Sequence, residues 1–175
     1  HCEGRDDLLE LELWQKAFIQ AVFGFVDKDT LYRKYTKVAL FIGRKNGKST
    51  LAAAIGLYML CADGEGGAEC YSVAVKKEQA KIVWDEAKKM INKSPVLHKK
   101  IRTLINGLFY DKKEAVFKAL ASQDNSLDGL NGSFVSADEI HAWTVKNLLN
   151  VLYDSMAVRC LLYTSPSPRD TERSR

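Results

Sequence analysis

The chain has 175 residues, enough for one domain with a hydrophobic core. Its 26 basic and 22 acidic residues give a formal net charge of +4, which permits an anionic partner without requiring one. The cysteines lack C-x-x-C spacing, and the longest apolar run, residues 51–62, is too short to cross a bilayer. Composition therefore gives no indication of a zinc site, a disulfide framework, a signal peptide or a membrane segment.

The N-terminal third is predicted to contain a helix, a strand and a second helix. Helical spacing of apolar residues predicts a packed helix over about residues 11–25, with these residues on its buried face: Leu13, Ala17, Phe18, Ala21 and Val22. Residues 37–42 are apolar and partly β-branched, as in a buried strand, and residues 51–60 are apolar throughout, as in a buried helix.

The segment between that strand and that helix, residues 43–50, reads Gly-Arg-Lys-Asn-Gly-Lys-Ser-Thr and is named the phosphate loop. A loop that leads into a helix N-terminus can direct backbone N–H groups at phosphate oxygens. Gly47 would allow a tight turn, Lys48 would reach the β- and γ-phosphates, and the Ser49 hydroxyl would bind Mg²⁺. The usual spacing puts its first glycine at position 42, where this chain has Ile42, so the loop is a variant.

Two cations inside the loop have open roles. Arg44 could approach the γ-phosphate and stabilise charge that develops during phosphoryl transfer, as an internal counterpart of an arginine finger. Lys45 could also add positive charge near the phosphates. Alternatively, both are solvated loop residues.

Farther along the chain, strands and helices alternate. A strand is predicted over residues 71–75, and a helix over residues 77–91 with Ala80, Val83, Trp84, Ala87, Met90 and Ile91 on one stripe. The lysines of this helix lie mainly off the stripe, where they are solvated or touch DNA phosphates. An Asn-Gly signal predicts a hairpin over residues 101–110. The alternation predicts an α/β fold with a mainly parallel sheet.

A short apolar run, residues 134–137, ends at two carboxylates, Asp138 and Glu139. At the carboxyl end of a parallel strand, Asp138 would face the metal held by Ser49 and orient a water of the Mg²⁺ shell. Glu139 would act as the general base that polarises the attacking water. The alternative is an acidic pair that simply ends a strand at the surface. His141 could sense the γ-phosphate or be a packed or capping group.

These motifs together resemble the large terminase subunits of tailed bacteriophages, the motors that pump DNA into capsids. The resemblance is carried by Leu-Trp-Gln-Lys at residues 13–16, Arg-Lys-Asn-Gly-Lys-Ser at 44–49, Lys-Glu-Gln-Ala at 77–80, Ser-Leu-Asp-Gly at 126–129 and Asp-Glu-Ile-His at 138–141. The motifs follow the family's order across most of residues 1–159. The resemblance implies a P-loop NTPase three-layer fold, incomplete here at the C-terminus, that hydrolyses ATP with Mg²⁺.

The resemblance also implies site residues and partners. Gln15 would contact the adenine ring, since its amide can donate to a ring nitrogen and accept from the exocyclic amine. The expected partners are double-stranded DNA, the portal protein, the small terminase subunit and further copies in a ring, a pentamer, with no membrane. The expected location is the cytoplasm of the infected bacterium and transiently the procapsid. The expected site residues are Gln15, Gly43, Arg44, Lys45, Asn46, Gly47, Lys48, Ser49 and Thr50 for the nucleotide, Ser49 and Asp138 for the metal, and Glu139 and Arg44 for catalysis.

The end of the chain differs from the rest. Residues 160–170 resemble a translated sequencing adapter, so the ATPase domain is expected to cover residues 1–159, a partial domain, and residues 160–175 are expected to be non-native and disordered. A real Ser-Pro tail is the alternative. A start at His1 fits a fragment open at both ends, without the family's nuclease domain. Two other functions stay open: a helicase-like nucleic-acid-dependent ATPase, and a truncated, non-catalytic nucleotide- or DNA-binding fragment.

Overall fold

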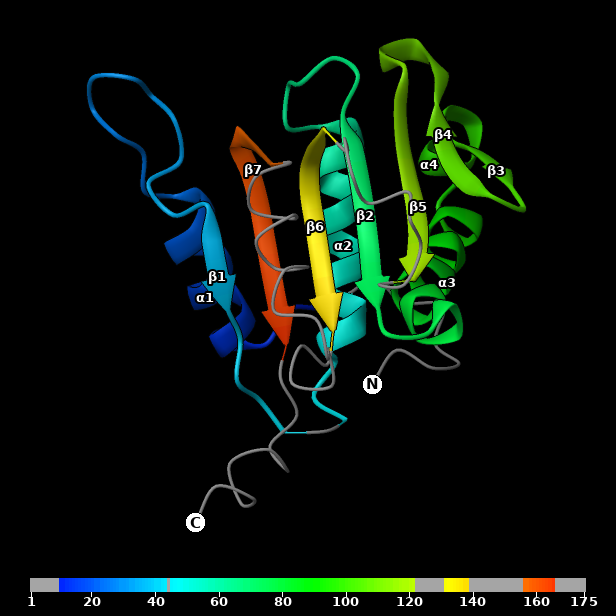
Figure 1. Ribbon diagram of the computed structural model, residues 1–175, viewed down its shortest axis with the longest axis horizontal. Coiled ribbons are helices and arrows are strands. Elements are labelled where there is room, and N and C mark those ends of the chain that lie inside the picture. The colour runs from blue at the N-terminus through cyan, green and yellow to red at the C-terminus, as the bar shows by residue number, and fades with distance from the viewer. Residues whose placement is uncertain (1–9, 44, 122–130, 139–155, 166–175) are drawn as a thin grey trace.

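The computed structural model describes residues 10–43, 45–121, 131–138 and 156–165, and these form a sheet with helices packed against it (Figure 1). The elements follow one another as α1 (Leu13–Phe23), β1 (Lys37–Ala39), α2 (Lys48–Cys61), β2 (Glu69–Ala74), α3 (Lys77–Lys93), α4 (Pro95–Lys100), β3 (Arg102–Leu104), β4 (Gly107–Tyr110), the 3₁₀ turn η1 (Asp111–Lys113), β5 (Ala115–Ala121), β6 (Gly132–Asp138) and β7 (Met156–Ser165).

Within these ranges, seven strands form one sheet in the order β1-β7-β6-β2-β5-β4-β3. The first five in this order run parallel to one another, and β3 and β4 form an antiparallel hairpin whose strand β4 pairs antiparallel with β5. The α/β class, the mainly parallel sheet and the hairpin are therefore confirmed. The predicted strand over residues 37–42 is shorter than expected, since β1 ends at Ala39.

Strand β7 lies between β1 and β6, and residues 160–165 belong to it. The register pairs Ala39 of β1 and Ala137 of β6 with the same residue of β7, Thr164. The boundary predicted at residue 159 thus falls inside a strand of the sheet. That boundary and the non-native origin of residues 160–175 stay predictions.

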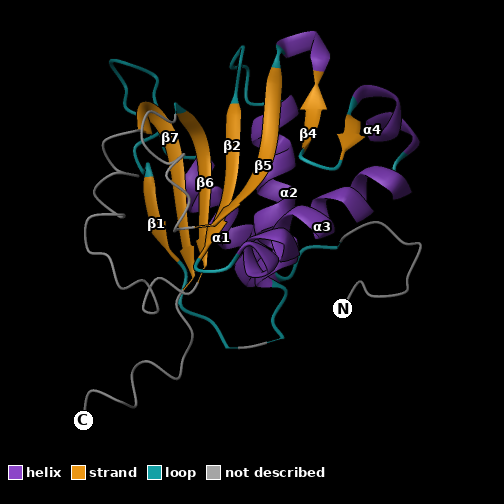
Figure 2. Cartoon of the chain, turned by 45° about the vertical axis from the view of Figure 1, so that its right-hand side comes forward, coloured by secondary structure: helices purple, strands orange, loops and turns teal. Residues whose placement is uncertain are grey.

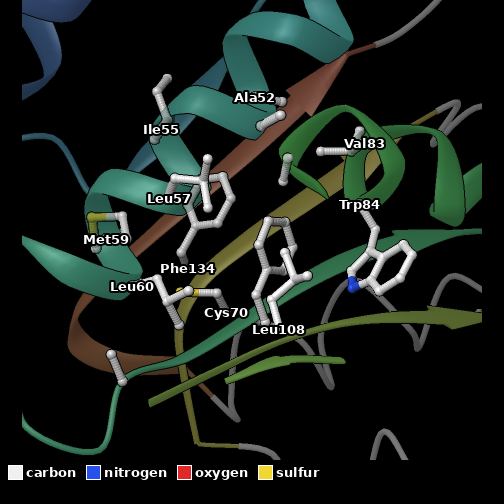
Figure 3. Close-up of a cluster of buried hydrophobic side chains, with 14 of the residues drawn as sticks. Ala52, Ile55, Leu57, Met59, Leu60, Cys70, Val83, Trp84, Leu108 and Phe134 are labelled. Atoms are coloured by element: carbon white, nitrogen blue, oxygen red, sulfur yellow. The ribbon is translucent and has the colours of Figure 1, made fainter. Parts of the chain in front are cut away.

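Helices α1, α2 and α3 all lie on one face of the sheet (Figures 1 and 2). Helix α2 occupies the middle of this layer, against α3 and strands β2, β5 and β6. Its buried side chains, among them Leu57 and Leu60, point toward Phe134 of β6 and Cys70 of β2 (Figure 3). Such an enclosed helix needs apolar residues on nearly every side, as its sequence provides.

Gly56 allows α2 to lie close to the sheet. A Cβ atom at this position would lie 2.8 Å from Cε1 of Phe117 and 3.2 Å from Cε1 of Phe134. Both rings are fully buried, so they have little room to move aside. This close contact fixes the height of α2 above β5 and β6, and with it the position of the segment that precedes the helix.

Gly56→Val is expected to destabilise the fold by about 3 kcal/mol, because the added methyl groups would overpack the contact with the two rings. Thermal unfolding should show this as a melting temperature lower by roughly 10 °C. Gly66→Val is the matched control, because a Cβ at Gly66 would have no atom within 4 Å. Equal melting temperatures for the two variants would contradict this account of the contact.

Helix α1 packs through a different face from the one that its sequence predicted. Leu13 is 83% exposed, and Ala17 and Ala21 are exposed too, whereas Val22 is buried and Phe18 is half-buried. The buried side also contains Gln15, and Trp14, Ile19 and Phe23 pack at its border. The prediction for Leu13, Ala17 and Ala21 was wrong because the large aromatic and branched side chains bury more apolar area than alanines do.

An ion pair anchors the connection between α1 and β1. Arg33 donates from Nη1 to Oδ1 of Asp63 at 2.6 Å and from Nη2 to Oδ2 at 3.1 Å, and both side chains are largely buried. The guanidinium also lies over the ring of Phe23, 5.4 Å from its centroid. These contacts tie the segment before β1 to the C-terminal end of α2.

Among the helices that the structure describes, none is both long enough and apolar enough to span a bilayer.

Candidate nucleotide-binding site

The phosphate loop follows the carboxyl end of β1 after a gap of three residues, 40–42, and includes the first turn of α2. Among the loop residues that the structure describes, the backbone has a positive φ at Lys45, φ +62°, and at Gly47, φ +73°. Only glycine adopts this left-handed region without a steric penalty, so the glycine at position 47 matches the local backbone. The loop is therefore strongly curved just before the helix begins.

Asn46 braces this curve. Its Nδ2 donates a hydrogen bond to the carbonyl oxygen of Gly43 at 3.2 Å, which joins the two ends of the turn. A side-chain amide that bonds nearby backbone is a common way to hold a turn without help from a ligand. The sequence predicts Asn46 as a nucleotide-binding residue. In the structure, its side-chain amide is bonded to the backbone of the same loop.

The N-terminus of α2 suits an anion. Gly47 is the N-cap residue, and since it has no side chain it makes no side-chain hydrogen bond to the first turn. By contrast, Ser94 caps α4 by accepting from the backbone N–H of Leu97. The first-turn N–H groups of α2 thus lack a capping side chain from position 47, and the helix dipole adds positive potential there. Lys48, Ser49 and Thr50 in this turn are half-buried.

Asp138 lies at the same edge of the sheet. It is the last residue of β6 and is half-buried, and the pairing of β7 with both β1 and β6 puts the ends of these two strands level. They are two strand spacings apart, about 10 Å. The loop that follows β1 and the carboxylate that ends β6 thus face the same region.

Asp138 also lies on the helical face of the sheet. Side chains alternate along a strand, so Asp138 shares a face with Phe134, which contacts α2 at Gly56. Asp138 lies about 13 Å beyond Phe134 along the strand. Ser49 lies about 10 Å before Gly56 along the helix. Helix α2 runs antiparallel to β6, so going back along the helix and forward along the strand both lead to the carboxyl edge of the sheet. Asp138 and Ser49 therefore lie at similar distances from the contact between Gly56 and Phe134.

These residues fit a magnesium ion better than a transition metal. Among the described residues, no group of three or more His, Cys, Asp or Glu side chains could hold a metal by itself. Mg²⁺ needs no such group, because it keeps several waters and takes few protein oxygens together with phosphate oxygens. A hydroxyl and a carboxylate level with each other, next to an anion site, match that chemistry.

Gln15, near the N-terminus, lies next to the phosphate loop. It is buried on α1, and a Cβ atom at Gly47 would lie 3.6 Å from its Nε2.

Three residues singled out by the sequence, Arg44, Glu139 and His141, lie outside the described residues. Sequence reasoning overlooked Glu12, whose backbone N–H donates to Oε1 of Gln15 at 2.9 Å. The acceptor three residues after a helix N-cap was the available signal.

A comparison with protein-family models matches residues 13–164 to the terminase large subunit, ATPase domain. The chain belongs to this family. The resemblance found in its motifs is thereby confirmed, and the terminase interpretation is favoured over the helicase-like one. The terminase match extends five residues past position 159.

Solved terminase structures share the fold. The crystal structure of the HK97 bacteriophage large terminase has a TM-score of 0.77 and 25% sequence identity, covering 90% of this chain and 33% of that chain. The large terminase of the thermophilic bacteriophage D6E in complex with ADP has a TM-score of 0.56 and 11% identity, covering 73% and 33%. The ATPase domain of the Thermus phage P74-26 large terminase has a TM-score of 0.54 and 17% identity, covering 87% and 69%.

The chain spans about a third of the length of the HK97 and D6E large terminases. A search of curated protein sequences gives no match.

Proposed function

We propose that this terminase chain binds ATP with Mg²⁺ and hydrolyses it to drive the movement of double-stranded DNA. The observation that carries the proposal is the convergence of the curved loop after β1, the N-terminus of α2 and Asp138 at one edge of the sheet. Open α/β sheets bind their ligands at the carboxyl ends of the strands. The D6E terminase, which has the same fold, was solved with ADP, and this supports a nucleotide as the ligand.

In this proposal the phosphate loop neutralises and orients the triphosphate. Backbone N–H groups of residues 43–50 bind phosphate oxygens, and the Lys48 ammonium pairs with the β- and γ-phosphates. Arg44 stabilises the charge that develops on the transferred group. Gly43, Lys45, Asn46 and Thr50 complete the loop, and Gln15 contacts the nucleotide from α1.

Magnesium would neutralise phosphate oxygens as charge moves to the leaving group. Of the chain's own residues, Ser49 would hold the ion through its hydroxyl, and Asp138 would accept a hydrogen bond from a water of its shell. Glu139 would orient the attacking water and accept its proton. The level positions of Ser49 and Asp138 support this division of roles.

For the whole protein we propose packaging of viral DNA into a capsid. The partners would be double-stranded DNA, the portal protein, the small terminase subunit and further copies in a ring, a pentamer. The protein would act in the cytoplasm of the infected bacterium and bind the procapsid transiently. A nuclease domain would belong to the remaining part of such a protein.

ATP turnover by the purified chain tests the proposal. We expect phosphate release that requires Mg²⁺, and we expect Lys48→Ala to raise the Kd for MgATP about 10- to 100-fold, because a charged contact to phosphate is lost. Lys45→Ala is the matched control in the same loop, with a smaller effect expected. Binding without turnover would instead support a non-catalytic fragment, and equal binding by the two variants would contradict the role of Lys48.

A further inference from the structure

Gln15 is the one glutamine side chain that the structure describes as buried, with 7% of its surface exposed. A buried amide needs hydrogen-bond partners for both ends. Its oxygen, Oε1, accepts from the backbone N–H of Glu12 at 2.9 Å, as part of a capping box at the start of α1. This bond fixes the amide at one end and orients the other.

The other end of the amide lies against the phosphate loop. Gly47 has no Cβ, but one built there would lie 3.6 Å from Nε2 of Gln15, so this end of the amide lies next to Gly47. Gly47 is the left-handed residue that turns the loop into α2. The Gln15 amide thus lies between the N-terminus of α1, to which its oxygen is bonded, and Gly47, the N-cap residue of α2.

We propose that Gln15 is a positioning residue for the phosphate loop, held in orientation by the backbone of Glu12. This inference rests on the proposed function of the loop and extends it. The amide supports the loop at Gly47 and so strengthens binding of the triphosphate itself, whatever base is attached. A residue that only reads adenine would leave binding of the phosphates unchanged.

The test compares three ligands that share the triphosphate. MgATP, MgGTP and magnesium tripolyphosphate are titrated into the purified chain and into Gln15→Met, a substitution of similar volume. The expected result is a Kd raised roughly three- to tenfold for all three ligands, because the loop loses its support. A loss confined to ATP, with tripolyphosphate binding unchanged, would overturn the inference and assign Gln15 to the base alone.

Gln20→Met on the exposed side of α1 is the matched control and should leave all three affinities unchanged. Melting temperatures of both variants show how much of the change is due to stability. If Gln15→Met and Gln20→Met are equally stable and bind all three ligands equally well, the inference is wrong. A wild-type chain that binds none of the ligands would refute the proposed function itself, and the inference with it.

A second pair of variants tests the role of Glu12 without changing Gln15. Glu12 has φ −61°, which proline adopts, so Glu12→Pro removes the N–H that orients Gln15 while fitting the backbone. Glu12→Ala keeps that N–H and removes only the side chain. Glu12→Pro should weaken tripolyphosphate binding two- to fivefold more than Glu12→Ala does. Equal affinities for the two variants would overturn the orienting role of Glu12.

Discussion

Glu139→Gln is expected to lower the rate of ATP hydrolysis about 10²- to 10⁴-fold while MgATP binding is kept. The amide has the size of the carboxylate and can still contact a water, but it cannot take up a proton. The loss should therefore appear in kcat and leave the Kd for MgATP within about threefold. Steady-state phosphate release and equilibrium titration on the same protein measure the two quantities.

The control for this substitution is Glu78→Gln, which removes an exposed carboxylate in the first turn of α3. Its turnover should equal that of the unchanged chain. If Glu139→Gln also turned over normally, Glu139 would not be the base, and the acidic pair would be a strand end at the surface. If binding and turnover fell together, the carboxylate would act on the bound nucleotide and not on the water.

Strong helical periodicity made parts of the fold predictable. The predicted stripe of α3 is buried at Ala80, Val83, Trp84 and Ala87, as expected for an amphipathic helix. Strand β5 could not be found this way, because Ala-Val-Phe-Lys-Ala-Leu-Ala has neither strict alternation nor many β-branched residues. It forms because β2 and β4 pair with it on either side.

The sequence names candidate site residues but not how they are arranged in space. The motif identifies Lys48 and Ser49 because triphosphate chemistry demands those side chains next to a tight turn. Local sequence does not give the strand order that makes the ends of β1 and β6 level. The position of the Gln15 amide next to Gly47 was equally unpredictable, because it depends on how α1 packs in the folded domain.

Asp138→Asn is expected to raise the Mg²⁺ concentration needed for half-maximal turnover about 10- to 100-fold, as is usual when an outer-shell carboxylate is lost. The amide keeps the shape of the side chain and removes the negative charge that favours a hydrated cation. Turnover measured across a Mg²⁺ titration at fixed ATP gives this midpoint. Asp85→Asn, on the exposed side of α3, is the control and should not move it.

The same titration separates the two carboxylates. If Asp138 orients the water shell of the ion, as proposed, added Mg²⁺ should restore most of the turnover lost in Asp138→Asn. Excess Mg²⁺ should not rescue Glu139→Gln if Glu139 is the proposed base, since the defect would then be in proton transfer. Ser49→Ala provides a further comparison, because Ser49 lies level with Asp138 and would hold the same ion. It should therefore shift the Mg²⁺ midpoint in the same direction. If Asp138→Asn leaves the Mg²⁺ midpoint unchanged, Asp138 is not part of the metal site. Ser49 would then be the one proposed protein ligand of the ion among the residues that the structure describes.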